Sequence, residues 1–205
     1  MNRLAAIPPI LFAALAAPAS ALPASALPAS AAPRYLPDQD VAVSYALSSP
    51  GNPAQDVQLS YSAAGGQARI DSPQGLYVLA SLPDGRAQVV IPALHAFVEA
   101  PDFSSITRMI SNADGASFTP LGHGFYAGLP CQTYLVLNHQ GSATACITPQ
   151  GVVLHFAGRD DNGSAELTAL SVAFAPQPAG NFATPYGYTE VTLPPGALAA
   201  LLRGQ

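Results

Sequence analysis

Apolar and polar residues alternate with a period of two from Val41 onward, which is the pattern of a β-strand with one buried face. Val41, Val43, Tyr45 and Leu47 share one face, and small alanine and serine residues take the other. The same alternation recurs over residues 57–61. The body of the chain is therefore predicted to be built from strands.

Turn-forming sequences rich in Gly, Pro, Asp and Ser separate the short apolar segments. They occur at residues 65–66, 72–75, 83–85, 149–151 and 160–163. Further strands are predicted at residues 67–71, 76–81, 86–91, 95–99, 131–137, 143–148, 152–158 and 165–174. The short connections favour an antiparallel meander over βαβ units.

Helix signals are scarce, and they are confined to residues 103–111 and 195–203. The predicted fold is mainly β, a curved antiparallel sheet (open half-barrel) of roughly eight to ten strands with one or two short helices. An incompletely closed sheet has a concave face on which an apolar ligand can lie. Residues 102–128, rich in Gly and carrying few strand signals, are predicted to be a loop that acts as a lid over this face.

The N-terminus has the pattern of an export signal, because residues 1–3 carry one positive charge and residues 4–17 are an unbroken apolar run. We expect a signal peptide over residues 1–26, with cleavage after residue 21, 26 or 31 at a small-x-small site. A Pro/Ala-rich linker (27–40), a β half-barrel domain (41–193) and a short C-terminal helix or tail (194–205) are expected to follow. The alternative, an apolar core helix at the N-terminus, is disfavoured by Pro8, Pro9 and Pro18.

No later segment reaches about 18 uninterrupted apolar residues, so no membrane span is expected in the mature chain. Export also makes the cysteines interpretable, since the chain has two, Cys131 and Cys146. An even pair in an oxidising compartment most often forms a disulfide, which here would join two neighbouring strands. A metal pair and a redox pair are the alternatives, but neither of their usual close spacings is present. The protein is expected to be periplasmic or secreted.

Only 9% of the residues are charged, and the seven cationic residues are all arginines. With a net charge of -5 and no lysine, the chain lacks the basic surface that nucleic acids and anionic membranes require. Lysine-dependent chemistry, including the P-loop and Schiff-base mechanisms, is excluded. The sequence also has no nucleophile elbow, zincin or dinucleotide-binding motif, so we expect no enzymatic activity and no cofactor.

The sequence offers few candidates for metal-ligating or catalytic residues. His123, His139 and His155 are spaced by 16 residues, which would allow a three-histidine metal site across neighbouring hairpins, while His95 lies apart. We favour the simpler interpretation of turn and surface histidines, and expect no metal. Among the carboxylates, those at or beside a predicted element are Glu99, Asp102 and Glu190, and we interpret them as rim charges.

Two aromatic groups remain, and each fits a ligand groove or a packed core. The first is Phe125 with Tyr126, and the second is Phe182, Tyr186 and Tyr188. We favour core packing for the second group, because Tyr186 and Tyr188 follow Pro185 in a pattern that predicts a strand packed across the end of the sheet.

Several short segments together resemble a family of small exported bacterial domains of unknown function, which is distantly similar to the outer-membrane lipoprotein carriers. They are Arg69-Ile70-Asp71, Tyr77-Val78-Leu79 and residues 88–92, 128–134, 145–151 and 182–188. The resemblance covers roughly residues 41–193. It implies a periplasmic open half-barrel whose mouth is plugged by helices, and no established catalytic residue.

The function we expect is that of a non-catalytic periplasmic module which binds an apolar ligand, such as a lipid, or an envelope protein on the concave face. One alternative is a structural or interaction protein of the envelope with a filled core. The other is a hydrolase whose nucleophile, base and orienting group match no known motif.

Overall fold

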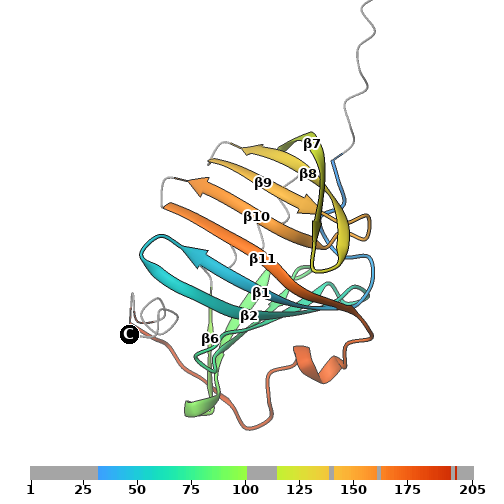
Figure 1. Cartoon of the computed structure of the whole chain (residues 1–205). Helices are drawn as coiled ribbons and strands as arrows, with labels where there is room; N and C mark the ends of the chain where they lie inside the picture. The colour runs from blue at the N-terminus through green and yellow to red at the C-terminus, as the bar shows by residue number, and fades with distance from the viewer. Residues whose placement is uncertain (1–31, 101–114, 139–140, 161–162, 195–196, 198–205) are drawn as a thin grey trace, which may run out of the picture.

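The computed structural model describes residues 32–100, 115–138, 141–160, 163–194 and 197. Twelve strands form one sheet in the order β12-β6-β5-β4-β3-β2-β1-β11-β10-β9-β8-β7. Their bounds are β1 (Val41–Ser49), β2 (Asn52–Ser62), β3 (Gln67–Asp71), β4 (Tyr77–Ser81), β5 (Arg86–Ile91), β6 (Ala96–Glu99), β7 (Ser117–Tyr126), β8 (Leu129–Asn138), β9 (Gly141–Ile147), β10 (Val153–Asp160), β11 (Gly163–Phe174) and β12 (Thr189–Glu190). The sheet is curved, and β3–β6 turn away behind β1 and β2 (Figure 1).

The predicted fold class is confirmed. Neighbouring strands pair antiparallel, apart from β12, which pairs parallel to β6. The two end strands β12 and β7 do not pair with each other, so the sheet is open. The predicted hairpin turns at residues 149–151 and 160–163 join β9 to β10 and β10 to β11.

The prediction that residues 102–128 form a lid loop is wrong for the described part, because Ser117–Tyr126 is β7. Pro120, Gly122 and Gly124 hide the strand pattern in the sequence. An edge strand tolerates proline, since it pairs on one side only. A register shift between Pro120 and Gly122, where Gly122 has φ 155°, accommodates the irregular sequence. With β7 and β12, the sheet exceeds the eight to ten strands expected.

The helical elements that lie wholly within the described residues are two short 3₁₀ turns, η1 (Pro92–Leu94) and η4 (Ala179–Phe182). Gly115 and Ala197 are single helical residues that adjoin segments outside the described ranges. The helix predicted over residues 103–111 lies outside the described residues, as does that over 195–203 except for residue 197. In the part of the chain that the structure describes, no helix has the length and apolar character needed to cross a membrane.

One face of the sheet is apolar from end to end. Paired residues on neighbouring strands point to the same face, so the register defines rows of side chains that cross the sheet. The row that we call the buried row is Val43, Leu59, Ile70, Val78, Val89 and Val98 across β1–β6. Its members are buried or half-buried, apart from Ile70, which is 38% exposed. Val43 and Val89 are 1% and 0% exposed. This row forms much of the core.

The opposite face is apolar only over β4–β6, where Tyr77, Leu79 and Val90 form a buried cluster with Phe97 and Tyr188. We call residues 175–193 the C-terminal strap. The strap supplies Tyr188, and it includes β12, which pairs with β6. Backbone hydrogen bonds from Thr189 N to His95 O (3.0 Å) and from Val191 N to Phe97 O (2.9 Å) hold this part of the strap against β6. The strap therefore covers a second apolar surface that the sheet itself leaves open.

Candidate functional site

The apolar face is half-exposed where it crosses β8–β11 and β1. We call this stretch the open row, and its members are Tyr134, Ala145, Phe156, Leu167 and Leu47. Phe156 is 36% exposed, and Tyr134, Leu167 and Leu47 are each half-buried. Strand alternation places these side chains on the same face as Tyr45, which is 4% exposed. The open row thus continues the core toward solvent.

Aromatic rings flank the open row on the side of β7. The Phe118 ring stacks on Tyr35 at 6.2 Å between centroids and meets the Tyr134 ring edge-on at 6.1 Å. Within the open row, the Phe156 ring lies close to Gly158, where a Cβ would be 2.7 Å from the ring. Glycine at 158 therefore lets the Phe156 ring lean over the β10 backbone.

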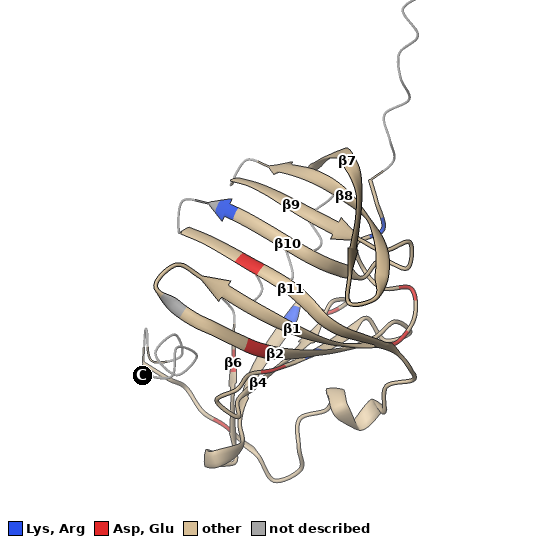
Figure 2. Cartoon of the chain, viewed as in Figure 1, with Lys and Arg blue, Asp and Glu red and all other residues tan. Residues whose placement is uncertain are grey.

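The reverse side of the same strands is polar. The register places Thr119, Leu135, Thr144, Ala157, Glu166 and Ser48 in a row there, and Thr133, Cys146, His155, Thr168, Ala46 and Asp56 in the next. Strands β8–β11 carry very little charge (Figure 2). The two faces therefore differ, and the face of Phe156, Leu167 and Leu47 is the one that favours an apolar molecule.

Cys131 and Cys146 form a disulfide that joins β8 to β9, as predicted, with 5.4 Å between their Cα atoms. Both are buried, at 3% and 2% exposure. A Cβ on Gly124 would lie 2.6 Å from Cys146 Sγ, so β7 passes directly over the disulfide at a position where only glycine fits. Beyond it, the Tyr126 ring stacks on His155 at 4.8 Å and 10°. The disulfide and this stack hold the β7–β8 hairpin against the polar face.

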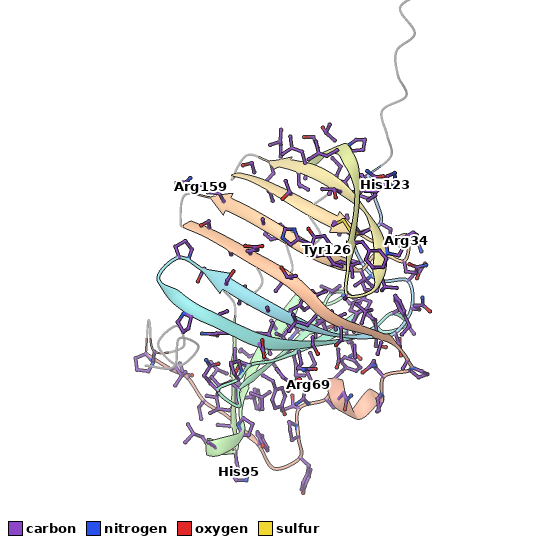
Figure 3. The ribbon with its side chains drawn as sticks, viewed as in Figure 1. Arg34, Arg69, His95, His123, Tyr126 and Arg159 are labelled. Carbon is purple, nitrogen blue, oxygen red and sulfur yellow. A yellow bond between two sulfur atoms is a disulfide. The ribbon has the colours of Figure 1, made fainter. Side chains whose placement is uncertain are left out.

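The structure separates the histidines (Figure 3). His155 Nε2 lies 3.0 Å from Glu166 Oε1, whereas His123 is exposed on β7 and His95 adjoins Tyr188 at the far end of the molecule. His139 lies outside the described residues. Among the described residues, no three His, Cys, Asp or Glu side chains are grouped as metal ligands. Among the described residues, the hydrogen-bond partner of the His155 ring is Glu166.

The carboxylates singled out from the sequence lie apart. Glu99 Oε1 accepts hydrogen bonds from Arg86 Nη2 (2.9 Å) and Gln88 Nε2 (2.7 Å). Glu190 is exposed on β12, and Asp102 lies outside the described residues. A carboxylate that the sequence did not single out, Asp40, is held more firmly. It accepts hydrogen bonds from the backbone N–H groups of Gln177 (2.8 Å) and Ala63 (2.9 Å), which hold the pKa of its carboxyl below the usual value.

Within each of the two aromatic groups identified from the sequence, some side chains are packed and others are exposed. Phe125 is 69% exposed, while its neighbour Tyr126 packs on His155. Phe182 is buried in η4 and Tyr188 is half-buried, but Tyr186 is fully exposed, so core packing holds for only part of the second group. The open-row residues were missed. Their signal was alternation at 134 and 136, masked because Leu135 and Leu137 are apolar as well.

Tyr45 shows how the core ends beneath the open row. Its hydroxyl donates a hydrogen bond to the carbonyl of Val153 at 2.8 Å, beside the register shift in β10. Burial raises the pKa of Tyr45 well above its usual value. The group therefore stays neutral and serves as a structural tie.

No family model matches the sequence, and no curated protein matches it. Among solved structures, the fold is similar to that of MucB in the MucA/MucB complex of Pseudomonas aeruginosa, with a TM-score of 0.51 and 15% identity over 77% of this chain. The match spans 62% of the MucB chain, so this chain corresponds to less than two thirds of that protein.

An uncharacterized conserved protein of Thermus thermophilus matches with a TM-score of 0.55 and 9% identity, over 75% of this chain and 90% of that one. A LolA-superfamily protein of Nitrosomonas europaea matches with a TM-score of 0.39 and 10% identity, over 73% and 92%. The structural neighbours thus include lipoprotein-carrier-like proteins, as the sequence resemblance predicted. At these identities the likeness concerns the fold alone.

Proposed function

We propose that the protein is an exported, non-catalytic module that binds an apolar molecule on the open row, the part of the apolar face expected to line the hollow of the half-barrel. The observation that carries this proposal is the half-exposure of Phe156, Tyr134, Leu167 and Leu47 in direct continuation of the core. A contiguous apolar patch that a folded chain leaves exposed often marks a site for a ligand or a partner.

The energetics suit a long alkyl chain. Burying about 15 methylene groups contributes roughly 12 kcal/mol at about 0.8 kcal/mol for each. Association removes at least about 4 kcal/mol of this. The remainder of about 8 kcal/mol corresponds to micromolar affinity. A lipid or another single-chain amphiphile is thus the class of ligand that the open row suits, and its polar end would remain in water.

Export is part of the proposal. A disulfide between neighbouring strands is typical of proteins that fold in an oxidising compartment. The expected signal peptide, residues 1–26, lies outside the described residues. Together with the disulfide, its sequence pattern supports a periplasmic or secreted location.

A protein partner is the second candidate occupant. MucB, which shares the fold, has been solved in complex with MucA. A partner that offers an apolar segment would bury the same side chains as a lipid. The alternative of a filled envelope protein fits the buried row, but it leaves the exposure of Phe156 without a role.

The test is titration of the mature protein with 1-N-phenylnaphthylamine, a neutral apolar dye that fluoresces when it leaves water. We expect saturable binding that Phe156→Asp weakens at least about tenfold, because a charge at this point opposes desolvation of the dye. Ala157→Asp is the matched control, since it places the same charge one residue away on the polar face. Equal losses in the two variants, or no saturable binding, would contradict the proposal.

Native mass spectrometry of protein purified gently from the periplasm then separates the occupants. An added mass in the range of a lipid supports carriage of an apolar molecule. Retention of a polypeptide supports the protein partner, and a clean apo mass counts against both.

A further inference from the structure

A groove of about 550 Å³ lies on the polar face, opposite the apolar rows, where β8–β11 and β1 reach the open end of the sheet. The groove is within the range of 300–1,000 Å³ that small-molecule sites occupy. Its lining comes from five strands and includes Ser48, Leu135, Ser142, Thr144, Arg159, Ser164 and Glu166. The register places Leu135, Thr144 and Glu166 in one row and Ser142, Arg159 and Ser164 in the next. Both rows lie on the face of the sheet opposite Phe156, so their side chains line the groove together.

Arg159 is the unusual member of this lining. Among the described arginines, Arg34 pairs with Asp38, Arg69 with Asp71, and Arg86 with Glu99. Arg159 has no carboxylate or hydrogen-bond partner among the described residues, although the chain carries an excess of acidic groups. Figure 3 places it at the end of β10, far from Arg34 and Arg69. An unpaired guanidinium in a groove presents a fork of N–H donors to whatever binds there.

The hydroxyl groups around Arg159 are similarly uncommitted. The side chains of Ser48, Ser142, Thr144 and Ser164 make no hydrogen bond within the described part of the chain, whereas Ser72, Ser81 and Thr184 elsewhere are bonded. Each hydroxyl offers one donor and two acceptor positions. Glu166, the acidic residue of the groove, is paired with His155 at 3.0 Å. The free hydrogen-bonding capacity of the groove is therefore that of one cation and several hydroxyls.

We propose that this groove binds a small oxyanion carried on a hydroxylated molecule, with Arg159 holding a carboxylate or phosphate group through paired hydrogen bonds. The serine and threonine hydroxyls bond the remaining oxygens of the ligand. Glu166 repels a second negative charge, so the groove selects ligands with one compact anionic group. The proposal is independent of the open row, because the two sites lie on opposite faces of the same strands.

The same chemistry has two sources, a soluble metabolite or the headgroup of an anionic lipid. Amide chemical-shift changes in ¹⁵N–¹H spectra of the mature protein distinguish them. The soluble probes are glycerol 3-phosphate and glycerate, with glycerol as the uncharged control. The lipid probe is phosphatidylglycerol in small bicelles, with phosphatidylcholine bicelles as its control.

We expect saturable shifts confined to residues 48–50, 142–144, 157–159 and 164–166 for at least one charged probe and for neither control. Arg159→Gln should weaken that binding about tenfold or more, since a hydrogen bond to a charged group is lost. Arg86→Gln removes an exposed arginine from another strand and should leave the binding unchanged. An unchanged melting curve for Arg159→Gln shows that the fold is intact.

The outcomes are decisive in each direction. Shifts with glycerol 3-phosphate or glycerate assign the groove to a soluble anion, and shifts with phosphatidylglycerol alone assign it to a headgroup. Binding that persists in Arg159→Gln overturns the proposal, as does the absence of saturable shifts with every charged probe. Loss of dye binding in Phe156→Asp with the anion shifts retained would show that the two sites stand or fall separately.

Discussion

The two halves of the sheet use their apolar face differently. Over β4–β6 the sheet is covered on both sides, with Val89 at 0% exposure on one face and Val90 at 0% on the other. Over β8–β11 the same apolar face carries Phe156 at 36% exposure, and the reverse side holds a groove whose lining includes Arg159 and several hydroxyl groups. One part of a continuous sheet is thus covered on both faces, and the other leaves a stretch of each face accessible.

The difference follows from what each half must cover. In β4 and β5 the apolar residues are consecutive, so both faces need a cover and the C-terminal strap supplies one of them. In β9–β11 small and polar residues occupy the reverse side, which water satisfies. A ligand site is therefore expected in the half where the cover of the sheet is less complete.

A buried charge gives the largest test of this contrast. Val89→Asp should lower the free energy of unfolding by about 4 kcal/mol or more, because it places an unpaired carboxylate at a fully buried position. Phe156→Asp on the open row should cost far less. Urea unfolding followed by circular dichroism measures both, and equal losses would mean that the open half is core as well.

Removal of the disulfide tests the open half alone. The double variant Cys131→Ser, Cys146→Ser should lose about 3 kcal/mol, as expected for a cross-link between cysteines 15 residues apart. Hydrogen exchange should accelerate first in β7 and β8, because β7 packs over the disulfide at Gly124. Faster exchange that begins in β4–β6 instead would contradict this division of the sheet.

A substitution at Arg69 tests how firmly the C-terminal strap is held against the sheet. Its guanidinium is bonded to Asp71 (2.6 Å), lies 3.8 Å above the Tyr77 ring, and donates to the Asn181 carbonyl of η4 at 3.5 Å. Arg69→Gln should cost about 1 kcal/mol, since the ion pair is partly solvated and the cation–π contact adds to it. Arg86→Gln is the control, with a smaller expected loss because Arg86 is 67% exposed. Thermal unfolding compares the two, and equal shifts would count against a role for Arg69 in holding the strap.

The smallest expected effect is that of Asp40, which ties the strap to the β2–β3 turn through Gln177 and Ala63. Because folding lowers the pKa of this carboxyl, its contribution is complete above the unfolded value of about 3.9 and disappears as the pH falls through the folded value. Asp40→Asn should therefore destabilise the protein at neutral pH, and the difference from wild type should shrink in acid. A difference that does not change with pH would exclude the carboxylate as its cause.

Much of the fold was accessible from local patterns. The predicted strands at residues 67–71 and 86–91 agree with β3 and β5 to the residue. The cysteine pair was predicted from its number and context, and the turn at residues 149–151 from its composition. These features depend on neighbouring residues, which is why periodicity and turn chemistry were sufficient.

The strands that escaped prediction depend on distant contacts. β7 contains Pro120 and Gly122, and it forms because β8 offers a free edge to pair with. β12 has two residues and forms only where the strap meets β6. The candidate site escaped for the same reason, since Tyr134, Phe156 and Leu167 come from three strands and meet only through the register of the sheet.

The sequence by itself determined that the chain forms an antiparallel β-sheet with a cross-strand disulfide, because strand alternation, turns and cysteine pairing are encoded over a few residues. The tertiary structure decided which stretch of the apolar face stays half-exposed and which of the described arginines stays unpaired. Both outcomes depend on strand register and on where the strap lies, and these are set by contacts between residues far apart in the chain.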